Sequence, residues 1–409
     1  KESHFIFSTL IEIYCKLGMI VKAQGVLDRL EIRDEISLIP LMTGYLEHGD
    51  CEEAFTYFKQ IQLEGATLES SLFVCGLKAY GSLKARDKGE EIYAEIEKKG
   101  WLEHKHVGNA LIDMYVKCGS VVIAQQVFDR LRIKDVVSWT TLISGYVEDG
   151  FHQEALRYFE LMQEQCVFPN AVTFVSALKS CGIGRNMDQG CEIHSQIEKQ
   201  GFLQRNCVIG NSLVNVYAKL GFPAKAQAVF DVLPVQDLVS WNTLIVGYSK
   251  LGETKNVFSI FYRMLERRIK PDSITFIAIL SVCSRTGYLD KSLTCFEAMS
   301  KEYGIKPSFN HCVWMINLLG CVGKLDKVME VARRMPYGPH LVVWHAVLSA
   351  SRRWGSLEHG ELAFKQAMHV DENNARASIL RSHIGGATVT RVGTLSLEMN
   401  VFDKACVCG

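Results

Sequence analysis

The chain has 409 residues, of which 48% are apolar and 22% are charged, and its 45 Lys and Arg residues balance its 45 Asp and Glu residues. This composition is typical of a soluble, well-packed protein. No apolar stretch approaches the ~18 residues that a membrane-spanning helix needs, which argues against a membrane protein. Among the 14 cysteines, Cys181 and Cys283 occupy matching points of a repeat, so we expect buried free thiols of a reducing compartment rather than disulfides.

The sequence repeats itself with a period of about one hundred residues. The string GYLEHGDCEEAFTYF at 44–58 aligns with strings that begin at residues 145 and 247. Two further families of strings share this period, beginning at residues 8, 109 and 211 and at residues 77, 178 and 280. The pattern is already running by His4, so we expect the true amino terminus, with any targeting peptide, to be missing. Three interleaved families with one period indicate a triplet repeat.

Each unit of the repeat is predicted to be a pair of helices. The residues Trp241, Leu244, Ile245 and Tyr248 form one apolar stripe of a helix that Gly252 ends. A second amphipathic helix follows. The glycine, which suits a left-handed helix end, recurs as Gly18, Gly49, Gly119, Gly150, Gly221, Gly287 and Gly323. A hairpin of about 35 residues cannot bury its apolar face alone, so neighbouring hairpins must stack into a superhelix.

Two strings carry a resemblance to a known family. VVSWTTLISGYVEDGFHQEALRYFELMQEQCVFPN at 136–170 and LVSWNTLIVGYSKLGETKNVFSIFYRMLERRIKPD at 238–272 closely resemble the pentatricopeptide repeat, and the resemblance spans residues 4 to about 374. Tetratricopeptide repeats also form hairpins of ~34 residues. They lack the Asn or Thr of the first helix paired with a Pro-Asp or Pro-Asn ending. The alternating unit lengths resemble the plant PLS subclass, in which long, short and standard motifs alternate.

This resemblance implies an all-α fold, a right-handed α-solenoid (superhelix) of stacked antiparallel helical hairpins. VVWHAVLSASRRWGSLEHGELAFKQAMHVD at 342–371 resembles the start of the subclass's E-type extension. From residue 385 onward the sequence has neither helical period nor family pattern, so we expect a truncated extension. The expected units are ten repeats (4–34, 35–69, 70–104, 105–135, 136–170, 171–206, 207–237, 238–272, 273–308, 309–340), an E-type extension hairpin (341–374) and a degenerate tail (375–409).

Small polar side chains recur at two positions of the units. Asn242, the fifth residue of its unit, lies ~100° round the helix from Trp241 and is expected to escape the core. Taken alone, such a residue is more commonly a cap or a solvated group. Repeated in register on one wall, such groups can each address one unstacked base edge. The fifth and last residues of the polar units, called fifth–last pairs below, are Ser8 and Asp34, Asn109 and Asp135, Thr140 and Asn170, Asn211 and Asp237, and Asn242 and Asp272.

By resemblance to the family, these pairs select the base. Asn with Asp favours U, Thr with Asn favours A, and Ser with Asp favours G. With the amino terminus toward the RNA 5′ end, the pairs imply the register GnnUAnUU. The fifth residues Ile39, Val74, Val175 and Ile277 depart from this pattern, and their units are left blank.

Basic residues concentrate in the second part of the chain. Residues 1–170 carry a net charge of −8 and residues 171–409 a net charge of +8. RNA affinity rests on neutralising phosphates, so we expect RNA contact from residue 105 onward. A solvated helix end explains the candidate backbone contacts equally well. These are Arg267, Arg268, Lys270, Arg333 and Arg334.

The sequence contains no catalytic constellation. His152 and Glu154 match the His-x-Glu of zinc deaminases, but no Cys-x-x-Cys follows, so we interpret the match as coincidence. Cys406 and Cys408 have no histidine nearby to complete a zinc site. We therefore expect a protein that is not an enzyme, with no catalytic residue, no metal and no cofactor.

The resemblance implies a single-stranded RNA-binding protein of the mitochondrion or chloroplast. It further implies a site-recognition factor for C-to-U RNA editing, with a deaminase-bearing partner protein acting in trans and no membrane contact. Two alternatives stay open. One is a helical-repeat scaffold for protein–protein interaction, and the other is an organellar RNA stability or splicing factor.

Overall fold

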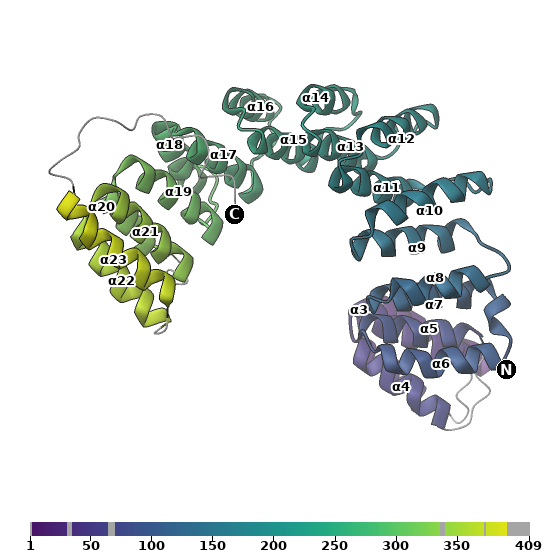
Figure 1. Ribbon diagram of the computed structural model, residues 1–409. Coiled ribbons are helices and arrows are strands. Elements are labelled where there is room, and N and C mark those ends of the chain that lie inside the picture. The colour runs from purple at the N-terminus through teal and green to yellow at the C-terminus, as the bar shows by residue number, and fades with distance from the viewer. Residues whose placement is uncertain (1, 31–34, 64–69, 336–339, 372–373, 391–409) are drawn as a thin grey trace. The chain divides into compact units, whose positions relative to one another are not determined.

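The computed structural model describes residues 2–30, 35–63, 70–335, 340–371 and 374–390. Within these ranges the chain forms 23 α-helices and one turn of 3-10 helix, with no strand (Figure 1). The all-α architecture expected from the sequence is confirmed. The helices form two compact bodies, residues 1–202 and residues 203–409.

The first body consists of helices that pair into hairpins. Their bounds are α1 Glu2–Lys16, α2 Ile20–Leu27, α3 Glu35–His48, α4 Cys51–Leu63, α5 Ser70–Ser82, α6 Arg86–Lys98, η1 Trp101–Glu103, α7 Lys105–Lys117, α8 Val121–Arg130, α9 Val136–Glu148, α10 His152–Glu164, α11 Ala171–Gly184 and α12 Met187–Lys199.

The second body continues the same pattern and ends on an additional helix, α23. Its helices are α13 Cys207–Lys219, α14 Pro223–Val232, α15 Leu238–Lys250, α16 Thr254–Glu266, α17 Ser273–Thr286, α18 Leu289–Lys301, α19 Phe309–Val322, α20 Leu325–Arg333, α21 Leu341–Trp354, α22 Leu357–Val370 and α23 Ala375–Thr390.

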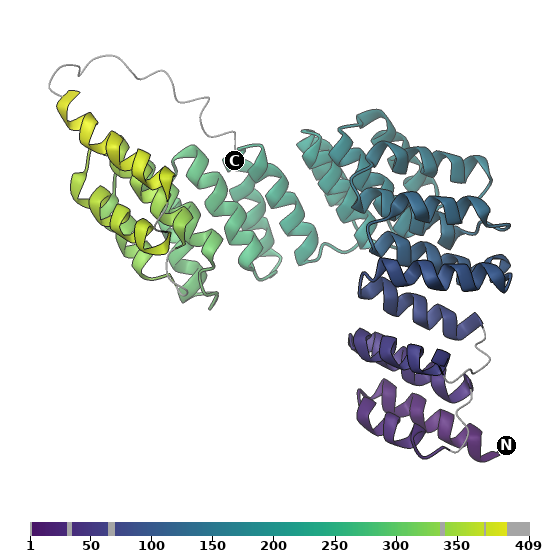
Figure 2. The same ribbon diagram turned by 60° about the horizontal axis from the view of Figure 1, so that its bottom comes forward.

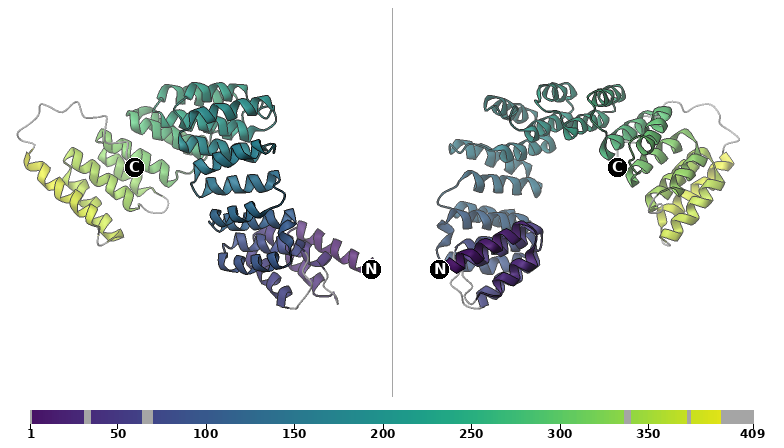
Figure 3. Two further views of the ribbon diagram at one scale, coloured as in Figure 1. Left: turned by 45° about the vertical axis from the view of Figure 1, so that its right-hand side comes forward. Right: turned by 180° about the vertical axis from the view of Figure 1, so that it is seen from behind.

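Within each body, the first helices of successive hairpins pack side by side. In the second body α13, α15 and α17 form one layer, and α14 and α16 lie on its outer side (Figures 1 and 2). The same stacking of hairpins is visible in the first body from two further directions (Figure 3). Each pair of helices lies within one of the ranges expected from the repeat, except that α1 begins at Glu2, two residues before the first range. The assignment of those ranges to repeats, extension and tail stays a prediction.

Glycine shapes the hairpins at two kinds of position. The chain turns after the first helix at a residue with positive φ, such as Gly252 at +78°, and the other glycines named for this role share that conformation. A second glycine lies inside the first helix, where neighbouring hairpins approach each other. A Cβ atom on Gly247 would lie 2.5 Å from Cβ of Ala218, and one on Gly145 would lie 2.5 Å from Cγ2 of Val116. The glycine of the recurring Gly-Tyr dipeptide therefore permits close packing of first helices.

Tryptophans fill the core between hairpins. Trp139 and Trp241 are each 1% exposed. Each meets a phenylalanine of the preceding hairpin edge to face, Phe128 and Phe230 respectively, with ring centroids 4.7 Å apart. The expectation that Trp241 lies on the buried stripe is confirmed.

The last helix, α23, departs from the expectation for the tail. The sequence showed no helical period from residue 385 onward, yet α23 continues through Thr390. Its buried residues Ala377 and Ile384 join the core formed with α21 and α22. A helix that this packing has already nucleated extends without a periodic apolar pattern of its own. Residues 391–409 lie outside the described residues.

Candidate nucleic-acid interface

The pair Asn242 and Asp272 joins two neighbouring hairpins. Asn242 lies in the first turn of α15, and Asp272 is the N-cap of α17. The Asn242 Nδ2 atom donates a hydrogen bond to Asp272 Oδ1 at 3.0 Å. The Thr275 hydroxyl completes the cluster, since it lies 2.6 Å from Asn242 Oδ1 and 3.0 Å from Asp272 Oδ1, and either oxygen can accept its proton. The two residues thus form one hydrogen-bonded unit across the seam between repeats.

The pair Asn109 and Asp135 has the same geometry in the first body. Asn109 Nδ2 donates to Asp135 Oδ1 at 3.1 Å, and the same oxygen caps α9 by accepting from the backbone N–H of Ser138 at 3.0 Å. Burial acts to raise the pKa of the Asp135 carboxyl. The hydrogen bonds from Ser138 and Asn109 outweigh burial and hold this pKa below its usual value, so the group is a carboxylate.

The pair Thr140 and Asn170 is bridged by Thr173. Thr173 donates its hydroxyl proton to Asn170 Oδ1 at 3.0 Å. The Thr140 hydroxyl therefore donates to the Thr173 hydroxyl, 2.7 Å away. Asn170 also caps α11, because its Oδ1 accepts from the Thr173 backbone at 2.9 Å. This pair is connected through a third residue rather than directly.

The pair Asn211 and Asp237 is also brought together. Burial acts to raise the pKa of Asp237, but hydrogen bonds from Ser240 and Asn211 lower it below its usual value. The Ser240 hydroxyl donates to Asp237 Oδ1 at 2.8 Å. Oδ1 of Asn211 is buried and has no hydrogen-bond partner in the described part of the chain. In the pair Asn242 and Asp272, the Thr275 hydroxyl lies against the corresponding oxygen.

The remaining pair is described only in part. Ser8 lies in α1 and is 6% exposed. Its expected partner, Asp34, lies outside the described residues. The sequence-based pairing of Ser8 and Asp34 therefore stays a prediction.

The fifth residues are more deeply covered than the sequence indicated. Asn242 is 6% exposed and Thr140 is 8% exposed, whereas we expected them to escape the core. The expectation was wrong because it considered one helix alone. The first helix of the next hairpin lies over this position, and its third residue, Thr173 or Thr275, contacts the fifth residue directly.

The last residues Asp135, Asn170 and Asp272 each keep a free polar atom. All the hydrogen bonds that the side chains of Asp135 and Asp272 make within the described residues go to Oδ1, which leaves Oδ2 as an acceptor. The contacts of Asn170 likewise go to Oδ1, which leaves its Nδ2 as a donor. All three residues are half-buried. The structure therefore presents an acceptor or a donor, depending on whether the last residue is Asp or Asn.

An exposed aliphatic side chain at the second position of the first helix was missed by the sequence analysis. Val239 is 58% exposed and lies ~200° round the helix from Trp241, away from the apolar stripe. A β-branched residue off the stripe in unit after unit was the available indication. The residues that share this position and exposure are Val137, Val172, Val208, Val239, Ile274 and Val342.

The basic residues named from the sequence lie at helix ends. Arg267, Arg268 and Lys270 are exposed on the connection that ends in Asp272, and no carboxylate of the described residues forms an ion pair with them. Arg333 is exposed in the last turn of α20. Arg334 pairs with Glu330 at 2.9 Å, so its charge is partly engaged. The three cations before Asp272 are therefore better placed to contact a phosphate than Arg334 is.

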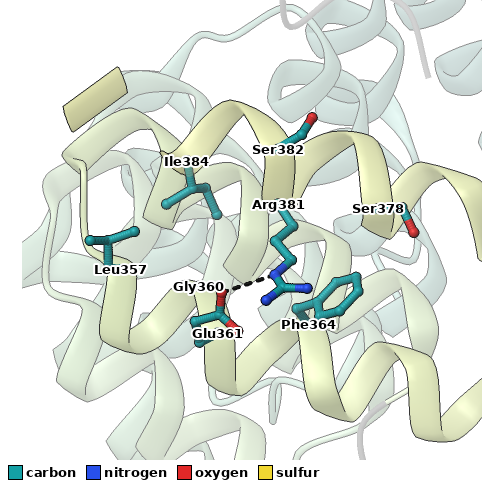
Figure 4. Close-up of a pocket in the computed structure, with 8 residues that line it drawn as sticks. All are labelled: Leu357, Gly360, Glu361, Phe364, Ser378, Arg381, Ser382 and Ile384. Carbon is teal, nitrogen blue, oxygen red and sulfur yellow. Dashed lines mark hydrogen bonds and ion pairs between the residues drawn. The ribbon is translucent and has the colours of Figure 1, made fainter. Parts of the chain in front are cut away.

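Two cavities in the described part of the chain are lined by residues other than the polar pairs. One, of about 380 Å³, is lined by residues that include Trp241 and Arg267. The other, of about 400 Å³, lies between α22 and α23, and there Arg381 pairs with Glu361 at 2.9 Å and covers the ring of Phe364 (Figure 4). With its charges paired, this second cavity offers no free ionic group to a ligand.

The cysteines differ in exposure. Cys181 and Cys283 are fully buried, and burial raises the pKa of each thiol to about 12. Cys166 and Cys321 are exposed, contrary to the general expectation of burial, because they lie at a helix end and on the outward side of α19. Cys406 and Cys408 lie outside the described residues. The described cysteines are free thiols, and the described residues hold no cluster of His, Cys, Asp and Glu that could bind a metal.

No described helix is both long enough and apolar enough to cross a membrane.

Comparison with known protein families identifies the repeat. A model described as PPR repeat family matches residues 134–182 and 236–285. A second, described as PPR repeat, matches residues 5–34, 40–65, 109–136, 211–235 and 274–303.

Proteins with similar sequences occur in Arabidopsis thaliana. A putative mitochondrial pentatricopeptide repeat-containing protein is 31% identical over 408 residues, which cover 98% of this chain and 64% of the relative. A chloroplastic pentatricopeptide repeat-containing protein is 32% identical over 372 residues, covering 90% and 69%. The chain thus spans about two thirds of the length of these two relatives, and only 42% of another.

A solved structure has the same fold. The pentatricopeptide repeat protein PPR10 from maize aligns with a TM-score of 0.54 at 17% identity, covering 94% of this chain and 63% of PPR10. PPR10 in complex with an 18-nt psaJ RNA element aligns with the same score at 19% identity, covering 93% and 58%. The repeat models match more than half of the chain, and the chloroplastic relative is aligned over more than two thirds of its own length. Both findings agree with the stacked hairpins of the structure. This chain therefore belongs to the pentatricopeptide repeat family.

Proposed function

We propose that this chain binds single-stranded RNA, with each fifth–last pair addressing one base. The observation that carries this proposal is that the described pairs are hydrogen-bonded across the seams between repeats, in register with the repeat. Asn109 with Asp135 and Asn242 with Asp272 have matching distances of 3.1 and 3.0 Å, although they lie in different bodies. The complex of PPR10 with an RNA element supports the same function for this fold.

The free atom of the last residue gives the selection a physical basis. Uracil and guanine carry a ring N–H, which an Asp Oδ2 acceptor matches. Adenine and cytosine carry a ring nitrogen with a lone pair at that place, which the Nδ2 donor of an Asn matches. Asp135 and Asp272 therefore suit U, and Asn170 suits A, in agreement with the register GnnUAnUU.

The exposed aliphatic side chains provide a surface for the apolar faces of a base. An unstacked base needs cover for its apolar faces. Val137, Val208 and Val239 are each about half exposed and lie three residues before a fifth residue, on the same helix. We assign them to the base faces, and the polar pairs to the base edges.

The cations at the helix ends provide contacts for the phosphates of the RNA. Arg267, Arg268 and Lys270 lead directly into Asp272, where they would meet the phosphates beside the base held at Asn242. Each such contact adds a sequence-independent, salt-dependent contribution to the affinity.

We further propose that the chain acts in an organelle as a site-recognition factor for C-to-U editing, with a deaminase supplied in trans. Relatives carry mitochondrial and chloroplastic names, which supports an organellar site of action. The alternating unit lengths, and the likeness of residues 342–371 to an E-type extension, support the PLS subclass. The editing role is tested by adding a deaminase-bearing partner to the bound RNA and sequencing for converted cytidines. RNA that stays unconverted with every such partner would reject this role and leave RNA binding intact.

The test of RNA binding is a fluorescence-anisotropy titration of the full chain with the RNA GAAUACUU at two salt concentrations. RNAs changed at the fourth, fifth, seventh or eighth nucleotide are the controls. We expect each change to weaken binding by about tenfold, corresponding to ~1.4 kcal/mol, and added salt to weaken binding to all of them. Equal or negligible binding to all these RNAs would overturn the proposal and favour a scaffold for proteins.

A further inference from the structure

The turn between α11 and α12 contains a cation in a backbone conformation that favours glycine. Arg185 has a φ of +53° and is the fifteenth residue of the range 171–206. In the ranges before and after, the fifteenth residue is Gly150 or Gly221, each with a φ of +84°. A residue with a side chain is strained there, because its Cβ atom approaches the following carbonyl oxygen. Among the described residues, Lys84 is the other fifteenth residue that is not glycine, and it is a cation too.

The guanidinium of Arg185 is available to a ligand. Arg185 is the C-cap of α11, and its backbone N–H donates to the carbonyl oxygen of Cys181. The residue is exposed, and no carboxylate of the described residues forms an ion pair with it.

The helix dipole alone does not explain a cation at the turn. The last turn of a helix favours a cation, and α7, α13, α15 and α17 each carry one there without strain. In contrast, α11 carries no cation in its last turn, and its arginine lies at the turn that follows. Glycine would adopt this conformation freely, so the backbone gains nothing from arginine. A strained residue whose backbone has no need of it indicates that its side chain has a function.

The range that contains Arg185 has no polar fifth residue. Its fifth residue is Val175, which offers no hydrogen bond to a base edge, so the sixth nucleotide of the register GnnUAnUU is unread. Arg185 follows Val175 by ten residues, which corresponds to about 15 Å along the helix axis. A nucleotide whose base edge faces the row of polar pairs directs its sugar and phosphate away from that row. A guanidinium matches phosphate oxygens with two parallel hydrogen bonds.

We propose that Arg185 binds a phosphate of the RNA backbone beside the sixth nucleotide, and thereby holds the strand across a unit that reads no base. This inference rests on the proposed RNA-binding function. The contact is independent of sequence, so a change of the sixth base leaves the affinity unaltered. Loss of the guanidinium weakens binding to every RNA by the same factor and reduces the salt dependence.

The test compares the unaltered chain with the variant Arg185→Gly, by fluorescence anisotropy with GAAUACUU at several salt concentrations. Glycine suits this turn, so the variant should fold, which circular dichroism checks. We expect the variant to bind about threefold more weakly at low salt. The slope of log affinity against log salt should become shallower by about 0.7, the contribution of one phosphate contact on a single strand. Arg185→Lys keeps the charge and should keep the slope.

Cys166→Gly is the matched control for the strain. Cys166 has a φ of +58° and is exposed, so this substitution removes the same strain without removing a charge. Its affinity and salt slope should equal those of the unaltered chain. A change in slope of the same size as in Arg185→Gly would show that the backbone, and not the guanidinium, is responsible, and would overturn the inference.

Neutral linkages in the RNA locate the contact. A methylphosphonate replaces the charged phosphate on the 5′ or the 3′ side of the sixth nucleotide. One of these two RNAs should bind the unaltered chain about threefold more weakly, and Arg185→Gly should not distinguish it from the charged RNA. If both neutral linkages weaken the two proteins equally, Arg185 holds no phosphate there.

Two outcomes separate this inference from the function on which it rests. If the unaltered chain discriminates at the fourth, fifth, seventh and eighth nucleotides but Arg185→Gly has the same salt slope, this inference fails alone. If no discrimination occurs at any position, the proposed function itself fails.

Discussion

Single atoms of the last residue divide between a structural role and the proposed recognition of a base. In Asp135 and Asp272, Oδ1 caps the following helix and holds the fifth residue, whereas Oδ2 is left over. Asp135, Asn170 and Asp272 are thus helix caps, as their positions before a helix favour, and each also carries a free atom. Because a cap fixes the side chain, the free atom is held in one place before any ligand arrives.

His311 shows how one residue of the seam can change. It occupies the third position of its unit, where Thr173 and Thr275 lie in theirs. The ring is completely buried, with Nδ1 2.7 Å from the Ser308 hydroxyl and Nε2 3.0 Å from the Ser273 carbonyl oxygen. Burial lowers the pKa of His311 below its usual 6.5, and the hydrogen bond to Ser273 opposes this only in part.

This shift predicts a pH-dependent stability. Below about pH 6.5 the unfolded chain takes up a proton that the folded chain does not, so the free energy of unfolding falls as the pH falls toward the folded pKa and levels off beneath it. Urea unfolding midpoints of the unaltered chain and of His311→Thr, measured between pH 7.5 and 5.5, test this. The unaltered chain should lose more stability on acidification than the variant. Parallel curves would show that His311 titrates normally.

Residue identity at the polar pairs was predictable from sequence, but residue exposure was not. The repeat period placed Asn109, Thr140 and Asn242 at one position of the unit. Their burial depends on the helix of the next hairpin, which no single amphipathic pattern contains. The partner threonines, Thr173 and Thr275, were missed for the same reason, since they belong to the following unit.

Close approach of helices depends on the glycine inside the first helix. Gly247 of α15 faces Ala218 of α13, and Gly145 of α9 faces Val116 of α7. The recurring Gly-Tyr dipeptide was visible in the sequence as part of the repeat. The structure explains the glycine of this dipeptide, because two first helices pack closely side by side at that position.

We expect Gly247→Ala to destabilise the second body by about 1–3 kcal/mol, since the added methyl group would lie 2.5 Å from Ala218 Cβ. Gly25→Ala is the matched control, because no atom lies within 4 Å of a Cβ at that position in α2. The same chemical change there should stabilise by roughly 0.5–1 kcal/mol. Urea unfolding followed by circular dichroism measures both, and equal effects of the two substitutions would contradict the packing argument.

The ends of the first helices followed from the recurring glycines, and the end of α23 is an exception. Gly252 closes the turn after α15, as the sequence indicated. At α23 the sequence lacks a periodic pattern beyond Ile384, and the helix nevertheless continues through Thr390. A periodic pattern indicates which face is buried, and a terminal helix with few buried residues shows little of it.

At the scale of the chain, the repeat places the proposed base-reading pairs at regular intervals along the sequence. Five units contribute a fifth–last pair, and the pairs Asn109 with Asp135 and Asn242 with Asp272, which lie in different bodies, have matching distances. In the proposed reading, the order of bases follows from the order of these units. Net charge does not follow the even spacing of the pairs: it is −8 in residues 1–170 and +8 in the remainder. We therefore place phosphate contacts mainly in the later units, whereas base selection begins wherever a complete pair occurs.

The most direct test of the account is a change of base preference produced by exchanging one free atom. Asp272→Asn should leave the cap on α17 in place, because Oδ1 still accepts from Thr275, and should replace the Oδ2 acceptor with an Nδ2 donor. Affinities of the unaltered chain and the variant for GAAUACUU and GAAUACUC, measured by fluorescence anisotropy, give the result. The unaltered chain should prefer U at the eighth position and the variant should prefer C, each by about tenfold. A variant that binds both RNAs more weakly, with its preference for U unchanged, would contradict the claim that these pairs read bases.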